Sequence, residues 1–144
     1  GKTIQRQELF DWSKEEDEQI RYYSGTAVYK TTFRWKSKVK EDQQVYLNLG
    51  KVCDLATVRV NGIDCGTIWT APYRADITAA LKKGVNELEI EVTNTWANAL
   101  KGADEGKAPF DGIWTNAKYR RAENTLLPAG LLGPLNFDVA NKNK

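Results

Sequence analysis

Alternating apolar and polar residues run through most of this 144-residue chain, and they restrict it to strands with one buried and one solvated face. In Tyr29–Lys36, for example, Tyr, Phe and Trp alternate with Lys and Arg. The same period of two recurs in Gln43–Gly50, Leu55–Val60, Ile63–Trp69 and Asn86–Thr93, and at Leu135, Phe137 and Val139. Half-buried strands of this kind are typical of antiparallel sheets. We expect the core to be built from the inward positions Tyr29, Thr31, Phe33, Trp35, Val45, Leu47, Leu49, Leu88, Ile90 and Val92.

Two neighbouring strands are joined by Asn61-Gly62, the preferred centre of a two-residue hairpin turn. This turn places Val60 opposite Ile63. Asn61 is explained by the turn itself, because asparagine tolerates the positive φ that the turn requires.

Helical signals are few and short. Asp76 or Thr78 can cap a turn at Ala79–Leu81, which Lys and Gly then terminate. Ser13 and Glu16 have the spacing of a capping box, which predicts a second turn at Lys14–Glu18.

Together these patterns predict an all-β fold, an antiparallel β-sandwich of jelly-roll type with one or two short helical turns. The length and a hydrophobic fraction of 41% fit a single domain with a full core. We expect this domain to span residues 1–144, with an N-terminal arm (1–19) anchored by Trp12, a long loop (97–125) and a frayed polar tail (140–144).

Composition excludes several functions. The chain has no His, so Ser-His-Asp and Cys-His mechanisms cannot operate within it. A formal charge of +2 without a basic run argues against nucleic acid as a partner. No apolar run approaches the ~18 residues of a membrane span, and no signal peptide is present. The absence of Met indicates a piece of a longer protein.

Cys53 and Cys65 are expected to remain separate thiols. In the hairpin register Val58 faces Cys65, and Cys53 lies five residues further along the strand, on the order of 16 Å away. A disulfide requires Cα atoms within about 7 Å. We therefore predict that Cys65 acts as a small core hydrophobe.

Three strings in order resemble a known family: SGTAVYKTTF, then the stretch from LNLGKVCDLATVRVNG to LEIEVTNTWANAL, and finally LLPAGLLGPLNF. They are similar to the galactose-binding-like, sugar-binding jelly-roll domain of glycoside hydrolase family 2. The similarity is closer still to the version in bacterial α-L-rhamnosidase-like enzymes, and it covers roughly Ile20 to Val139. The resemblance implies an accessory module of an exported, periplasmic or extracellular bacterial enzyme. It also implies that the catalytic carboxylates lie on a separate domain.

Carbohydrate sites combine aromatic rings, which pack on the C–H face of a sugar, with planar polar groups that bond to its hydroxyls. The expected carbohydrate-binding residues are Trp69, Tyr73, Arg74, Trp96, Asn98 and Trp114. Core packing is an equal alternative for Trp69 and Trp96. The expected partners are a glycan and the catalytic domain of the parent enzyme.

Acidic groups give weaker signals. Glu89 and Glu91 lie about 7 Å apart on one strand face, a separation that glycosidases use, but a solvated strand face explains them more simply. Asp104, Glu105 and Asp111 could bind Ca²⁺ in the long loop, although their spacing is not that of a known calcium loop. We therefore predict no catalytic residue and no required cofactor. Two alternatives stay open: a purely structural or protein-interaction sandwich, and a free-standing hydrolase.

Overall fold

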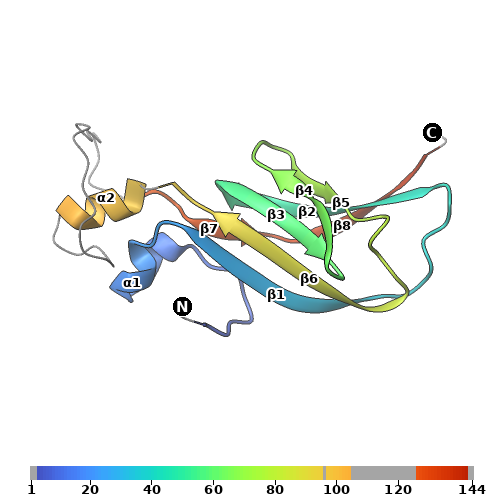
Figure 1. The fold of residues 1–144 in the computed structure, drawn as a ribbon, viewed down its shortest axis with the longest axis horizontal. Helices are drawn as coiled ribbons and strands as arrows, with labels where there is room; N and C mark the ends of the chain where they lie inside the picture. The colour runs from blue at the N-terminus through green and yellow to red at the C-terminus, as the bar shows by residue number, and fades with distance from the viewer. Residues whose placement is uncertain (1–2, 96, 105–125, 143–144) are drawn as a thin grey trace.

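The computed structural model describes residues 3–95, 97–104 and 126–142, and it shows two antiparallel sheets packed face to face (Figure 1). The helices α1 and α2 lie at one end of this elongated sandwich, and the C-terminus lies at the other. The predicted all-β sandwich with short helices is confirmed.

Sheet A has the strand order β1-β6-β3-β4. Its strands are β1 (Thr26–Trp35), β6 (Gly84–Thr93), β3 (Leu55–Val60) and β4 (Ile63–Ile68). The Asn61-Gly62 hairpin forms as predicted, with φ values of 52° and 77° and with Val60 opposite Ile63. A register shift between Thr57 and Arg59 then moves the remaining pairs of the hairpin.

Sheet B is organised around the central strand β2 (Gln43–Cys53). One side of β2 pairs with β5 (Tyr73–Asp76). The other side pairs with β7 (Gly130–Gly133) and then with β8 (Asn136–Asn141). Two of these strands, β5 and β7, were not expected from sequence, because four residues are too few to show a period of two.

The core lies between the sheets and uses the predicted alternation. Buried side chains come from Val45, Leu47, Leu49, Val58, Val60, Leu88, Ile90, Val92, Ile77 and Leu131. On β1, Tyr29, Phe33 and Trp35 are half-buried and pack against this core, whereas Thr31 is exposed and lies beside a hollow under the N-terminal arm. The contribution of β1 is smaller because it is an edge strand.

The helical segments differ from expectation. The predicted capping box at Ser13 is wrong, because aspartates cap both N-terminal helices: Asp11 caps η1 (Trp12–Lys14) and Asp17 caps α1 (Glu18–Arg21). A carboxylate at the N-cap accepts backbone N–H groups as effectively as a serine hydroxyl does. The residues after β5 form a hydrogen-bonded turn in which Asp76 accepts from the backbone of Thr78, as its capping role predicts.

Two expected irregular segments contain regular structure. The predicted loop 97–125 begins with α2 (Ala97–Asp104), where Ala, Leu and Lys favour helix. The tail expected to fray from residue 140 is still part of β8, because Ala140 and Asn141 pair with β2. None of the helices in the described ranges is long and apolar enough to cross a membrane.

Candidate functional site

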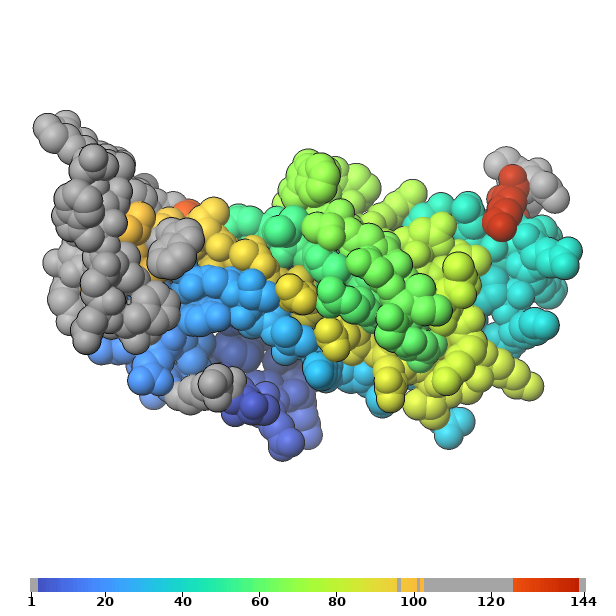
Figure 2. Space-filling model, viewed as in Figure 1, coloured from blue at the N-terminus to red at the C-terminus, as the bar shows by residue number. Residues whose placement is uncertain are grey.

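Three of the expected carbohydrate-binding residues lie together where the chain passes from β4 to β5. This connection rises above the body of the sandwich (Figures 1 and 2). Trp69 enters it with 68% of its surface exposed. Tyr73 opens β5 and is half-buried against the core. The exposed Arg74 follows, so one short segment presents an indole, a phenol and a guanidinium.

A neighbouring aromatic ring fixes the position of Arg74. Its guanidinium carbon lies 4.2 Å from the centroid of the Tyr46 ring on β2. This contact is a cation–π interaction, which holds the planar guanidinium flat against the ring. Within the described part of the chain Arg74 has no ion pair. The donors of this guanidinium therefore remain available to other groups.

Asn98 does not join this group. It lies in α2, at one end of the molecule and away from the β4–β5 connection (Figure 1). The Asn98 side chain is 3% exposed, and its amide accepts from the backbone N–H of Leu127 and donates to the Leu127 carbonyl, both at 2.8 Å. These bonds attach α2 to the segment that leads into β7. Trp96 and Trp114 lie outside the described residues.

The outer face of sheet B carries polar residues that sequence reasoning did not select. Asn48 on β2 donates to Asn136 Oδ1 and to Asp138 Oδ2, both at 2.7 Å. The alternation in β2 does place Tyr46 and Asn48 on the other face of the strand from the buried valine and leucines. No sequence signal, however, shows which strands flank β2, so this group could not be assembled in advance.

The acidic pair on β6 is engaged in ion pairs. Arg59 on β3 bonds to Glu89 at 3.3 Å and to Glu91 at 3.2 Å, and Lys30 lies 3.7 Å from Glu89. The hydrogen bond to Glu91 raises the pKa of Arg59 above its ordinary value. Two carboxylates that share one arginine on an exposed sheet face match the solvated strand face expected from sequence.

The segments described by the structure contain no group of three or more His, Cys, Asp or Glu residues that could hold a metal ion. Of the predicted calcium ligands, Asp104 is the last residue of α2, and Glu105 and Asp111 lie outside the described residues. The calcium site therefore stays a prediction.

The cysteines are separate thiols, as predicted. Cys53 is buried, and Cys65 is half-buried and packs against the core. Burial raises the pKa of each thiol. Both residues therefore behave as small hydrophobes, in agreement with the sequence-based expectation for Cys65.

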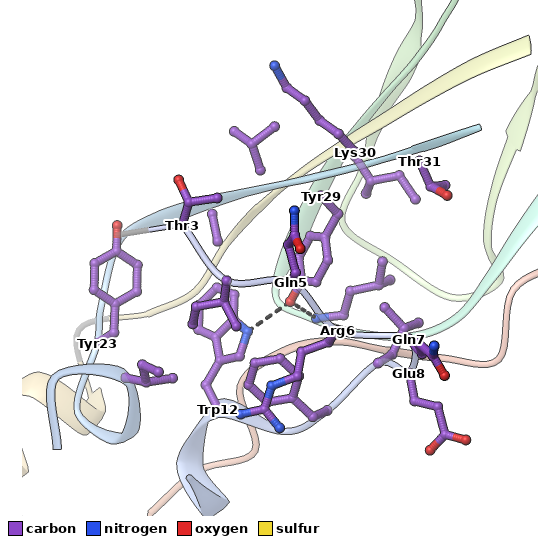
Figure 3. Close-up of a pocket in the computed structure, with 18 of the residues that line it drawn as sticks. Thr3, Gln5, Arg6, Gln7, Glu8, Trp12, Tyr23, Tyr29, Lys30 and Thr31 are labelled. Atoms are coloured by element: carbon purple, nitrogen blue, oxygen red, sulfur yellow. Dashed lines mark hydrogen bonds between the residues drawn. The ribbon is translucent and has the colours of Figure 1, made fainter. Parts of the chain in front are cut away.

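A hollow lies between the N-terminal arm and the inner face of β1 (Figure 3). Trp12 closes one side of it, with only 4% of its surface exposed, and so anchors the arm as expected. Its indole N–H donates to the Tyr29 hydroxyl at 2.8 Å, and the same hydroxyl accepts the Leu131 backbone N–H at 3.2 Å. Burial raises the pKa of Tyr29, although these two hydrogen bonds oppose the shift. The hydroxyl joins the arm, sheet A and sheet B, which is a structural role.

The fold and these surfaces define a β-sandwich module with an aromatic, arginine-bearing connection at its surface. The sequence profile of the family described as "Glycosyl hydrolase 2 galactose-binding domain-like" matches residues 6–125, so the chain belongs to this family. The expected resemblance is confirmed.

Individual relatives agree with the family. A protein named "Putative beta-glucuronidase" from Formosa agariphila is 40% identical over 157 residues, which cover 92% of this chain and 13% of that protein. The solved structure of a rhamnosidase from Novosphingobium sp. PP1Y is 43% identical, with a TM-score of 0.77, over 90% of this chain and 12% of that chain. An FMN-binding β-glucuronidase structure from Faecalibacterium prausnitzii, at 23% identity and a TM-score of 0.58, shows the same fold. The chain thus spans about one eighth of the length of each of the first two relatives.

Proposed function

We propose that this domain is a non-catalytic, carbohydrate-associated module of a multidomain bacterial glycoside hydrolase. In this role it supports the catalytic domain and contacts the glycan substrate through the β4–β5 connection. The proposal is supported by family membership and by the small share that this chain covers of relatives named as a glucuronidase and a rhamnosidase. By the same resemblance, the parent enzyme is exported to the periplasm or the medium.

Exposure of Trp69 is the observation that carries the glycan contact. An indole with 68% of its surface exposed leaves a large apolar area in water, and removal of this area from water is favourable when the indole packs on a sugar ring. Tyr73 and Arg74 follow within five residues and supply polar groups for hydroxyls. Trp96 and Trp114 remain predicted contacts that lie outside the described residues, whereas the buried amide of Asn98 is bonded to the Leu127 backbone.

A specific observation also favours the alternative, a module that binds only protein. Phe137 and Val139 on β8 are 37% and 53% exposed, and Phe137 packs against Phe33 and Trp35 of β1 at centroid distances of 4.9 and 5.3 Å. These residues form an apolar seam between the edge strands of the two sheets. Contact of this seam with a catalytic domain would support the parent enzyme without any affinity for sugar.

Removal of the domain from its parent enzyme tests the supporting role. We expect deletion of residues 1–144 to lower the thermal unfolding temperature of the enzyme and its activity on an aryl glycoside. The isolated domain should not hydrolyse the same substrate. Unchanged stability and activity after deletion would refute the supporting role, and turnover by the isolated domain would refute the non-catalytic assignment.

Titration of the isolated domain with oligosaccharides tests the glycan contact. Tryptophan fluorescence should change on saturation in the wild type, and the W69A variant should lose binding. The I63A variant is a matched control, because Ile63 is 50% exposed at the β3–β4 turn and is no part of the connection. Equal binding by wild type and W69A would leave the protein-binding alternative as the better explanation.

A further inference from the structure

We propose that the outer face of sheet B is an oligosaccharide-binding platform that takes an uncharged glycan. The platform consists of Tyr46 and Asn48 on β2, Arg74 on β5, and Asn136 and Asp138 on β8. This inference rests on the carbohydrate-associated function proposed above, but it assigns the main binding surface to a sheet face rather than to the β4–β5 connection.

Strand register brings these residues onto one face. Asn48 lies opposite Arg74 on one side and opposite Asn136 on the other. Two residues along β2, Tyr46 lies opposite Asp76 and Asp138. Side chains of directly opposed residues project to the same side of a sheet. Because Val45, Leu47 and Leu49 are buried in the core, Tyr46 and Asn48 and their cross-strand partners face outward.

The polar groups of the platform are already held in place. Asn48 uses both amide hydrogens, since it donates to Asn136 and Asp138 at 2.7 Å each. On the other side of β2, the Tyr46 ring holds the Arg74 guanidinium at 4.2 Å. Groups that are ordered before binding lose less conformational freedom when they meet a ligand, so each hydrogen bond to the ligand is more favourable.

Comparison with sheet A separates this arrangement from an ordinary solvated face. On sheet A the guanidinium of Arg59 is occupied by Glu89 and Glu91, so that charges cancel within the face. On sheet B the part of the chain that is described offers Arg74 a ring and no carboxylate. Arg74, Asn136 and Asp138 are all exposed, and the hydrogen bonds described for the two β8 residues use only Asn136 Oδ1 and Asp138 Oδ2.

The chemistry of these groups fits a row of hydroxyls. Two strand spacings of about 4.8 Å separate β5 from β8, so the donors of Arg74 and the acceptors around Asp138 are on the order of 10 Å apart. A hydroxyl both donates and accepts, and an extended oligosaccharide can meet both ends. Arg74 carries +1 and Asp138 carries −1, so the five platform residues have no net charge, and the neighbouring Asp76, opposite Tyr46 on the same face, adds −1. This charge disfavours a uronate and favours a neutral sugar.

The platform is continuous with the connection that carries Trp69. That connection leads through Tyr73 directly into β5, where Arg74 is the next residue. Trp69 itself follows β4 of sheet A and precedes β5 by four residues, so an oligosaccharide that extends from sheet B past β5 can reach this exposed indole.

Backbone amide NMR of the 144-residue chain tests the platform. The probes are xylohexaose, cellohexaose and a galactan hexamer, with hexagalacturonic acid as the anionic comparison. We expect at least one neutral probe to shift the amides of β2, β5 and β8 around the five platform residues, and the uronate to bind more weakly. The R74A variant should raise the Kd by about tenfold or more, as loss of a hydrogen bond from a charged group does. N48A should also raise the Kd, because Asn136 and Asp138 lose the amide that holds them in place. R74K, which keeps the charge but not the planar stack, should lose part of the affinity.

The R34A variant is the matched control, because Arg34 is exposed on β1 of sheet A, and it should bind as the wild type does. Circular dichroism of each variant checks that the fold is retained. Absence of binding across the panel, equal Kd values for R74A and R34A, or tighter binding of the uronate would overturn the platform. Shifts confined to the β4–β5 connection would overturn it while preserving the proposed glycan contact at Trp69. The deletion experiment on the parent enzyme is independent of all these outcomes.

Discussion

Replacing Tyr29 with phenylalanine tests whether one hydroxyl fastens the N-terminal arm to both sheets. The hydroxyl accepts hydrogen bonds from Trp12 at 2.8 Å and from the Leu131 backbone at 3.2 Å. The Y29F substitution keeps the ring, which stacks on Trp12 at a centroid distance of 6.5 Å, and leaves both donors without a partner. An unsatisfied buried donor costs about 1–3 kcal/mol. Because Tyr29 is only half-buried, we take the lower end for each donor and expect a loss of about 2 kcal/mol.

For a chain of this length, such a loss corresponds to a fall in Tm of roughly 6–8 °C. Urea denaturation followed by circular dichroism and tryptophan fluorescence measures the free energy of unfolding. Y23F is the matched control, since Tyr23 also contacts Trp12 but its exposed hydroxyl donates only to the Thr26 carbonyl. We expect Y23F to change stability by less than about 0.5 kcal/mol. Equal stabilities of Y29F and Y23F would refute the idea that the Tyr29 hydroxyl holds the arm.

Three further predictions concern the backbone, a buried amide and pH. Gly50 has a φ of +67°, and an added Cβ would collide with the Gly133 carbonyl, so the G50A substitution should destabilise the domain by about 3 kcal/mol or more. Gly84 has a φ of +98° but open space around it, so G84A should destabilise the domain by only about 1 kcal/mol. Chemical denaturation of both variants measures the difference, and similar losses would contradict the predicted clash. Asn86 is fully buried, and its side-chain amide makes four hydrogen bonds. The N86A substitution should therefore destabilise the domain by about 3 kcal/mol. A loss below about 1 kcal/mol in the same assay would show that water replaces these hydrogen bonds. Burial raises the pKa of Tyr29 above the ordinary value of 10.0, so the contribution of Tyr29 to stability is complete below about pH 10 and is lost as the pH rises through the folded-state pKa. In urea denaturation between about pH 9 and 11, the free energy of unfolding should therefore fall less steeply for Y29F than for the wild type. Parallel declines of the two proteins would contradict this prediction.

Much of the fold was predictable because its signals are local. A period of two identified the buried faces of β2 and β6, and Asn61-Gly62 specified its own turn through backbone φ. The capping role of Asp76 was equally local, since it depends on a neighbour two residues away. Each of these features is fixed by residues within one strand or one turn.

The candidate site was predictable only in part. Trp69, Tyr73 and Arg74 lie within six positions of one another, so their closeness in space follows from the sequence. Asn98 was grouped with them by residue type alone, and the structure places it in a helix at one end of the sandwich, bonded to Leu127. Side-chain chemistry alone does not determine whether an asparagine faces a ligand or satisfies a buried backbone.

Strand neighbours were decided by tertiary structure alone. The order β5-β2-β8 combines segments around residues 46, 74 and 138, and it creates the polar platform from side chains that separately look like ordinary surface residues. Likewise, the Tyr29 hydroxyl meets Leu131 only because the two sheets close on each other. The sequence alone determined which face of each strand is apolar, because that depends on alternation along the chain. Tertiary structure decided which strands lie side by side, because that depends on how all the apolar faces are buried at once.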